Sequence, residues 1–285
     1  MATGVVEVER RAQPFVKWAG GKRQLLGEIR RRLPESFDNY YEPFVGGGAV
    51  FFDLRPARAA INDVNASLIN AYCQIRDAPL DVMDYLDAVD AGQAAAPCAK
   101  TYYYEVRERY NEALAAGAAD PECAALFIYV NKHCFNGLYR VNAKGRFNVP
   151  FNNSRRASYL PENILSLSEV LKSAVITCGD FEPAVDGAKT GDFVFFDSPY
   201  VPLKADTFEA YTKEGFAKEE HERLARLFRK LAGRGVSCML TNHDTPFIRK
   251  LYDGFPIDSV AVRRSINSDA SKRTGTEVII TSYRR

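Results

Sequence analysis

The pattern of hydrophobic and polar positions divides the chain into two kinds of sequence. Before residue 64 and again after residue 173, short apolar runs alternate with amphipathic stretches, as in an α/β sheet. From residue 65 to about 130, apolar residues recur at helical spacing, which indicates a mostly helical insert. Strands are expected at 40–44, 59–62, 174–178, 192–197, 235–240, 257–262 and 277–283, and helices at 22–33, 49–53, 65–76, 79–89, 101–115, 121–134, 218–232 and 244–252. No helix separates the last two strands, so we expect them to pair antiparallel at a sheet edge.

An irregular segment, residues 131–158, interrupts this regularity. It is rich in Asn, Gly, Arg and Phe, and irregular stretches of this length are usually functional or disordered. The window from Cys123 to Pro161 contains no Asp or Glu, although 36 acids in 285 residues would place about five there. Cations interleaved with aromatic and amide side chains are typical of nucleic-acid binding, whereas a basic solvated loop is the simpler alternative. The cations are Lys132, Arg140, Lys144, Arg146, Arg155 and Arg156.

Composition limits the remaining function classes. The 38 Lys and Arg nearly balance the 36 Asp and Glu, so the net charge of +2 excludes a globally cationic surface. The longest apolar run, 123–130, is too short to cross a membrane. The six cysteines form no C-x-x-C pair and no secretion signal is evident, so we expect reduced thiols, no metal and a cytoplasmic location.

A glycine turn follows the first predicted strand. Gly46, Gly47 and Gly48 lie between this strand and a helix, where glycine allows a sharp turn against a ligand. Asp63 ends the next strand, where a carboxylate can bind ribose hydroxyls. A plain tight turn explains the triplet equally well.

Asp197-Ser-Pro-Tyr200 ends the apolar run 192–196, at the strand edge where α/β sheets bind ligands. The Asp197 carboxylate and the Ser198 carbonyl could accept both N–H bonds of an exocyclic amine on a heteroaromatic ring. They would direct its lone pair at an electrophile, while stacking on Tyr200 would contribute about 1–3 kcal/mol. A proline turn with an Asp helix cap is the structural alternative.

Seven motifs occur in an order that resembles the Dam-type DNA adenine-N6 methyltransferases (D12 class, alpha group), over about residues 14–283. They are Phe15-Val-Lys-Trp-Ala-Gly-Gly-Lys22, Glu42-Pro-Phe-Val-Gly-Gly-Gly48, Asn62-Asp-Val-Asn65, Asn136-Gly-Leu-Tyr-Arg140, Phe147-Asn-Val-Pro-Phe151, Asp197-Ser-Pro-Tyr200 and Thr241-Asn-His-Asp244. The resemblance implies a Rossmann-like class I S-adenosylmethionine-dependent fold, with residues 1–64 and 161–285 as the catalytic domain. Residues 65–160 would form a helical target-recognition domain. The implied reaction is methyl transfer from S-adenosylmethionine to N6 of a flipped adenine in double-stranded DNA, within GATC.

The resemblance also implies roles for individual residues. The implied cofactor contacts are Trp18, Lys22, Gly46, Gly48, Asp63, Asp180, Phe181 and Asp197. The catalytic turn is Asp197, Ser198, Pro199 and Tyr200. The expected DNA contacts are Phe135, Asn136, Leu138, Arg140 and Pro150 at bases, with Lys144, Arg146, Arg155 and Arg156 in the basic segment. A second basic cluster, Arg263, Arg264, Lys272 and Arg273, suits phosphates.

One position departs from the family pattern. The family usually carries Asp-Pro-Pro-Tyr, and Ser198 stands where the first proline would be. Serine relaxes a backbone that proline would stiffen. A sequence-specific DNA-binding protein with weak or lost activity therefore stays open as an alternative. Independently of Ser198, a methyltransferase that acts on RNA adenine or a protein amide stays open as well. We expect a monomer in solution.

Overall fold

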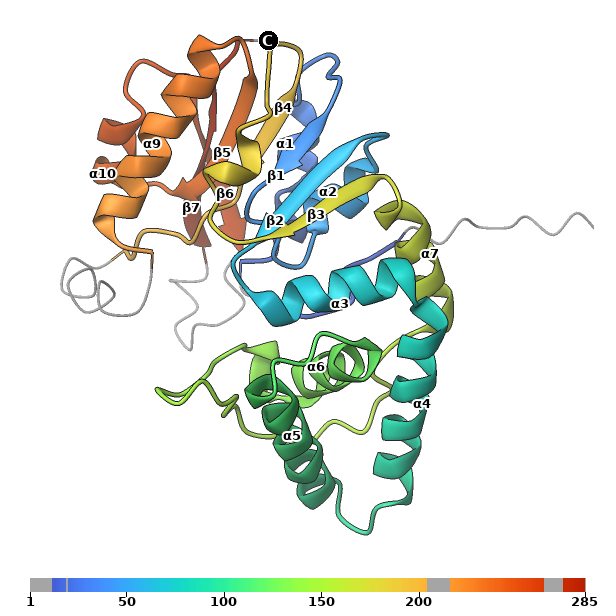
Figure 1. The fold of residues 1–285 in the computed structure, drawn as a ribbon. Coiled ribbons are helices and arrows are strands. Elements are labelled where there is room, and N and C mark those ends of the chain that lie inside the picture. The colour runs from blue at the N-terminus through green and yellow to red at the C-terminus, as the bar shows by residue number, and fades with distance from the viewer. Residues whose placement is uncertain (1–11, 19, 204–215, 264–273, 285) are drawn as a thin grey trace, which may run out of the picture. The chain divides into compact units, whose positions relative to one another are not determined.

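The computed structural model describes residues 12–18, 20–203, 216–263 and 274–284 (Figure 1). Over these residues the chain forms two compact units. The helical unit comprises Met1–Ala19, Gly46–Arg55 and Ala66–Ser173, and the sheet unit comprises Gly20–Val45, Pro56–Asn65 and Ala174–Arg285. No helix in the described ranges is long and apolar enough to cross a membrane.

The sheet unit is built on a sheet that has seven strands in the described part of the chain, in the order β3-β2-β1-β4-β5-β7-β6. The first five strands of this order are parallel, and β7 is antiparallel to both β5 and β6. The strands are β1 (Tyr40–Glu42), β2 (Ala59–Asp63), β3 (Ala174–Cys178), β4 (Phe193–Phe196), β5 (Ser237–His243), β6 (Ile257–Arg263) and β7 (Thr274–Thr281). This architecture confirms the predicted α/β class and the antiparallel pairing of the last two strands.

The core of the sheet unit explains why these strands form. All residues of β4 are buried, as expected for a central parallel strand covered on both faces. Helix α9 (Lys218–Gly233) buries Leu224, Phe228 and Leu231 at helical spacing and lies beside β5 (Figure 1). Shorter helices complete the unit: η1 (Lys22–Gln24), α1 (Leu26–Arg31), η3 (Pro183–Val185) and α10 (Pro246–Leu251).

The helical unit is organised around α6 (Pro121–His133). The run from Cys123 to Asn131 is buried on every side, because α3, α4 and α5 all pack against this helix. Asp120 caps α6 by accepting a 2.8 Å hydrogen bond from the backbone N–H of Cys123. The other helices are α2 (Ala49–Leu54), α3 (Ala66–Asp77), α4 (Pro79–Ala95), α5 (Ala99–Ala115), η2 (Phe135–Gly137) and α7 (Pro161–Leu171).

Several elements differ from the expected ones; α4, for example, extends to Ala95, whereas the predicted helix ended at residue 89. The predicted helix 22–33 is divided into η1 and α1 at Leu25, and α7 was not predicted. The sequence did carry a signal for α7, since Pro161 stands at its start and Ile164, Leu167 and Leu171 form its buried face. The irregular segment 131–158 that precedes it obscured this pattern.

Candidate active site

Polar side chains gather at one edge of the sheet unit, which we call the catalytic edge. Asp63 ends β2, Asp197 follows β4, and His243 ends β5. Because these strands are parallel, their carboxyl ends lie at the same edge, where α/β sheets bind ligands. The antiparallel strand β7 adds Glu277, which is the register partner of His243.

Asp197 is the centre of this edge. Its Oδ1 lies 2.7 Å from the Lys22 ammonium and accepts a 2.9 Å hydrogen bond from the Thr241 hydroxyl. Burial raises the pKa of the Asp197 carboxyl, while Lys22 and Thr241 act in the opposite direction. In the described ranges neither neighbour contacts Oδ2, so one carboxylate oxygen is held and the other stays available as an acceptor.

Tyr200 is fixed beside Asp197. Its hydroxyl donates a 2.8 Å hydrogen bond to Glu277 Oε2, and the His243 ring packs edge-on against it at 4.8 Å. The Lys22 ammonium lies 4.5 Å from the centroid of the Tyr200 ring. Burial and the nearby carboxylates raise the pKa of Tyr200 well above its usual value, so the hydroxyl stays protonated and donates. The edge thus combines an acceptor with an oriented aromatic ring.

The turn after β4 is tied to β5 through Val201. The Val201 N–H donates to Asn242 Oδ1 at 3.0 Å, and its carbonyl oxygen lies 2.7 Å from His243 Nδ1, which therefore carries the ring proton. Ser198 is 2% exposed, and its hydroxyl has no hydrogen-bond partner among the described residues. The turn is held by side chains of β5 and not by the Ser198 hydroxyl.

A second buried amide ties the strand ends around Asp63. Asn62 donates 3.0 Å hydrogen bonds to the carbonyl oxygens of Pro43 and Gly179, and accepts one of 2.9 Å from the Thr177 hydroxyl. It thereby joins the ends of β1, β2 and β3. Asp63 itself accepts a 2.9 Å hydrogen bond from the N–H of Asn65 at the tip of β2.

Asp180 and Phe181 follow β3. Asp180 pairs with Arg223 of α9 and accepts a 2.9 Å hydrogen bond from the N–H of Glu182. Phe181 is buried against Phe44 at 5.1 Å, and the Arg223 guanidinium lies 4.2 Å from the centroid of its ring. The structure therefore places Asp180 on the surface of the sheet unit and the ring of Phe181 in its core.

The other three predicted cofactor residues, Trp18, Gly46 and Gly48, belong to the helical unit. Gly46 and Gly48 have φ values of +48° and +71°, which favour glycine. A Cβ at Gly46 would lie 2.9 Å from Trp18 Cδ1, and one at Gly48 would lie 2.6 Å from the Tyr72 hydroxyl. The Trp18 ring stacks on Tyr139 with centroids 5.8 Å apart. Both glycines are thus required by their backbone conformation and by close neighbours.

The irregular segment forms an ordered turn followed by a short hairpin. We call residues 136–140 the recognition turn; Asn136 and Gly137 have φ values of +56° and +65°. The hairpin closes through bridges between Val141 and Phe147 and between Cys134 and Phe151. This segment is anchored on α5, where Asn111 accepts a 2.7 Å hydrogen bond from the Phe147 N–H and donates to its carbonyl oxygen.

The predicted DNA contacts lie mainly on the surface of the helical unit. Phe135 and Leu138 are 55% and 40% exposed, which is unusual for large apolar side chains. The Arg140 Nε donates a 2.7 Å hydrogen bond to Asn148 Oδ1, which orients the guanidinium. Asn136, Arg140, Lys144, Pro150, Arg155 and Arg156 are exposed, whereas Arg146 is half-buried and pairs with Glu108. Arg263 ends β6, whereas Arg264, Lys272 and Arg273 lie outside the described residues.

The sequence did not identify several residues of the catalytic edge. Thr241 and His243 stood in a noted motif without a catalytic assignment, and Glu277 had no local signal because its position depends on where β7 pairs. Among the described residues, no group of three or more His, Cys, Asp or Glu side chains could hold a metal ion.

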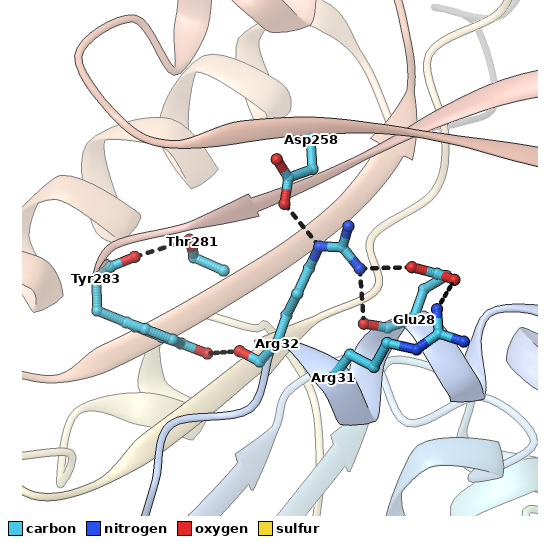
Figure 2. Close-up of polar contacts among 6 residues, drawn as sticks. All are labelled: Glu28, Arg31, Arg32, Asp258, Thr281 and Tyr283. Carbon is cyan, nitrogen blue, oxygen red and sulfur yellow. Dashed lines mark hydrogen bonds and ion pairs between the residues drawn. The ribbon is translucent and has the colours of Figure 1, made fainter. Parts of the chain in front are cut away.

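The opposite edge of the sheet unit has a cavity of about 480 Å³ beside Phe255 and Tyr283. Figure 2 shows that its central cation, Arg32, lies between Glu28 and Asp258, which it contacts at 2.6 Å each. The Tyr283 hydroxyl donates to the Arg32 carbonyl oxygen at 2.8 Å. The charge of this guanidinium is compensated within the protein, so the cavity does not compete with the catalytic edge as a candidate active site.

Comparison with known proteins gives a consistent result. The family model of the D12 class N6 adenine-specific DNA methyltransferases matches residues 18–266. A type II methyltransferase of Lactococcus lactis subsp. cremoris is 40% identical, with 95% of each chain covered. A type II methyltransferase of Methanocaldococcus jannaschii is 38% identical over 95% of this chain and 99% of its own. The DNA adenine methylase of Escherichia coli K12 is 32% identical, with 96% of each chain covered.

Proposed function

The chain belongs to the D12 class N6 adenine-specific DNA methyltransferases, and we propose that it methylates a flipped adenine within GATC in double-stranded DNA. The family uses S-adenosylmethionine to methylate adenine in DNA. We assign the chemistry to the catalytic edge and sequence recognition to the recognition turn. In this proposal residues 65–160 are the target-recognition domain, and residues 1–64 and 161–285 are the catalytic domain.

The residues at the strand ends fit S-adenosylmethionine. Asp63 offers a carboxylate at the tip of β2, which suits the ribose hydroxyls of an adenosine group. The positive φ values of Gly46 and Gly48 favour glycine, and because glycine has no side chain, a ligand can approach the backbone of this turn closely. We assign Trp18, Lys22, Asp180 and Phe181 as further contacts, and Asp197 lies at the same sheet edge as Asp63. When bound, this cofactor supplies an electrophilic methyl group.

The observation that carries the proposed chemistry is the asymmetric environment of Asp197. Lys22 and Thr241 hold its Oδ1, so Oδ2 can accept an N–H bond of the adenine amine. The Ser198 carbonyl would accept the second N–H bond, and the lone pair of the amine would then point at the methyl group. Methyl transfer would break the bond between the methyl group and the cofactor sulfur, which keeps the electron pair, and would leave an extra proton on the amine. The raised pKa of Asp197 makes Oδ2 a suitable acceptor for that proton.

Tyr200 would hold the flipped adenine by stacking on its ring. The Lys22 ammonium lies over one face of this ring, and it would have to move for adenine to stack on that face. The hydrogen bond of Tyr200 to Glu277 fixes the plane of the ring. The intact contacts of Lys22, Asp197 and Thr241 favour an active enzyme over a DNA-binding protein that has lost its activity.

Specificity for GATC is proposed for the recognition turn. Arg140 keeps its terminal nitrogens available for O6 and N7 of guanine, because only its Nε contacts Asn148 in the described part of the chain. Phe135 is exposed immediately before the recognition turn, where an aromatic ring can enter the base stack. The absence of acidic residues from 123 to 161 favours contact with phosphates.

The direct test is methylation of defined duplexes by the purified full-length chain with S-adenosylmethionine. Mass spectrometry should find N6-methyladenine in a GATC duplex, and much less in duplexes with one base changed or in the matching RNA. Replacing the target adenine with 2-aminopurine should raise its fluorescence on binding if the base leaves the stack. Methylation at another sequence would overturn the GATC assignment, and an unchanged 2-aminopurine signal would overturn base flipping.

A further inference from the structure

Asn131 connects two segments of the helical unit that are far apart in sequence. It lies in the last turn of α6 and is 1% exposed. Its Oδ1 accepts a 2.8 Å hydrogen bond from the Lys17 N–H. Its Nδ2 donates to the carbonyl oxygens of Lys17 at 2.9 Å and Gly137 at 3.2 Å. The carboxamide therefore uses both donors and its acceptor on the backbone of these two residues.

Two further contacts hold the recognition turn against the Lys17–Trp18 segment. A Cβ on Gly137 would lie only 2.3 Å from Lys17 Cβ, so the backbones approach as closely as glycine allows. On the other side of the turn, the Tyr139 ring stacks on Trp18. The recognition turn thus contacts Lys17 through Gly137 and Trp18 through Tyr139.

We infer that Asn131 is a positioning residue for base discrimination. In the described ranges its hydrogen bond to the turn goes to Gly137, which is buried, and this bond fixes the backbone from which Leu138 and Arg140 project. This inference rests on the proposed function, because it assigns discrimination to the recognition turn. An error in the direction of a side chain that contacts a base costs discrimination, whereas affinity for phosphates depends mainly on charge.

The test uses variants of the full-length chain that disturb the contact between the recognition turn and Lys17, by substitution either of Asn131 or of Gly137. Asn131→Ala removes the carboxamide, and Asn131→Asp keeps the acceptor while losing both donors. Gly137→Ala displaces the turn from Lys17 without changing the core of α6. The matched control is Asn70→Ala, since Asn70 is also a buried amide of the helical unit, with bonds to Asp120 and Gln74.

The first measurement is the ratio of kcat/KM on the preferred duplex to kcat/KM on single-base variants. We expect Asn131→Ala and Gly137→Ala to lower this ratio by about tenfold or more, with a smaller change in affinity for random DNA. Asn70→Ala should leave the ratio close to that of the wild-type protein. The ratio is taken on whichever sequence the wild-type protein prefers, so a preference other than GATC overturns the proposed function and not this inference.

The second measurement does not depend on activity. Trp18 is the one tryptophan in the sequence, so tryptophan emission reports on its stack with Tyr139. Acrylamide should quench this emission more strongly in both Asn131 variants and in Gly137→Ala than in the wild-type protein and Asn70→Ala. If Asn131→Ala does not fold, Asn131→Asp and Gly137→Ala decide the outcome. Wild-type discrimination and wild-type quenching in Gly137→Ala would overturn the inference.

Discussion

The catalytic edge and the recognition turn hold their functional side chains in different ways. At the catalytic edge the side chains fix one another: Asp197 contacts Lys22 and Thr241, and Tyr200 contacts Glu277. In the recognition turn most functional side chains are exposed, and the protein fixes the backbone beneath them through Asn131 and glycine. Under the proposed function, the reacting groups are arranged before the substrate arrives, whereas the groups assigned to base contacts stay free to pair with DNA.

This difference predicts two kinds of mutational effect. A change at the catalytic edge removes a group that acts at the reacting atoms, so the rate should fall while DNA binding persists. A change in the recognition turn should alter which sequence is methylated while the chemical step persists.

Asp197→Ala should lower turnover by about 100-fold or more, because an acceptor aligned with the target amine acts mainly in the transition state. Affinity for a GATC duplex should change little. Single-turnover methylation and equilibrium binding measure the two effects. Asp244→Ala is the matched control, since Asp244 follows the neighbouring strand, is paired with Arg249 and has the same 18% side-chain exposure as Asp197. Retention of more than about a tenth of wild-type turnover by Asp197→Ala would remove it from the chemical step.

Arg140→Ala should lose about 1–3 kcal/mol of discrimination at one guanine, which is the value of a bidentate contact. Its chemical rate on a fully bound duplex should stay close to that of the wild-type protein. Methylation rates on GATC and on single-base variants, at one salt concentration, measure this loss.

Arg155→Ala provides the contrast, because this exposed cation should weaken binding to all sequences about equally and reduce the salt dependence. If Arg140→Ala behaved in the same way as Arg155→Ala, Arg140 would be a phosphate contact. Another residue would then have to make the base contact that discriminates between sequences.

Thr241→Val should move the acidic limb of the pH profile of kcat/KM to higher pH. The Thr241 hydroxyl stabilises the charged form of Asp197 and so opposes the rise of its pKa on burial. Asp197 must be ionised to accept an N–H bond, so activity falls as the pH drops through its pKa, and that fall should begin at higher pH in the variant. Thr281→Val is a control, since its hydroxyl bonds to the Tyr283 carbonyl oxygen at the opposite edge. An unshifted limb would mean that another group controls it.

Ser198→Pro should leave turnover within about twofold of the wild-type value, or raise it, and add about 0.4–1 kcal/mol to the free energy of unfolding. The Ser198 hydroxyl has no partner in the described ranges, so its loss sacrifices no hydrogen bond there. Thermal unfolding and steady-state turnover measure both effects, and Ser198→Ala separates loss of the hydroxyl from stiffening by proline. A large loss of activity in folded Ser198→Pro would show that serine has a function of its own.

The sequence allowed prediction of the sheet, because buried strands such as 192–197 and amphipathic helices such as 218–232 carry strong local patterns. The strand ends followed from those patterns, which is why Asp63 and Asp197 could be placed at one edge. The sequence did not reveal that Lys22 pairs with Asp197 or that Glu277 meets Tyr200. These contacts join residues far apart in the chain and depend on the strand order.

For the irregular segment, too, the sequence allowed only part of the structure to be predicted. Its missing acids and its cations were evident without any structure, so its chemical character was predictable. Its conformation was not predictable, because it depends on hydrogen bonds between residues far apart in sequence. Asn131 of the segment bonds to Lys17, and Asn111 of α5 bonds to Phe147 of the segment. Residue composition indicates what a surface can bind, whereas side-chain clamps of this kind have no periodic signature.

The position of β7 determines when the catalytic edge can form during synthesis. β7 is the last strand in sequence, yet it lies between β5 and β6 in the sheet. Until its residues leave the ribosome, β5 has a free edge and Tyr200 lacks its partner Glu277. A nascent chain can therefore fold its helical unit while its catalytic edge is still incomplete. The hydrogen bond that fixes the Tyr200 ring is thus available only after β7 has paired with β5.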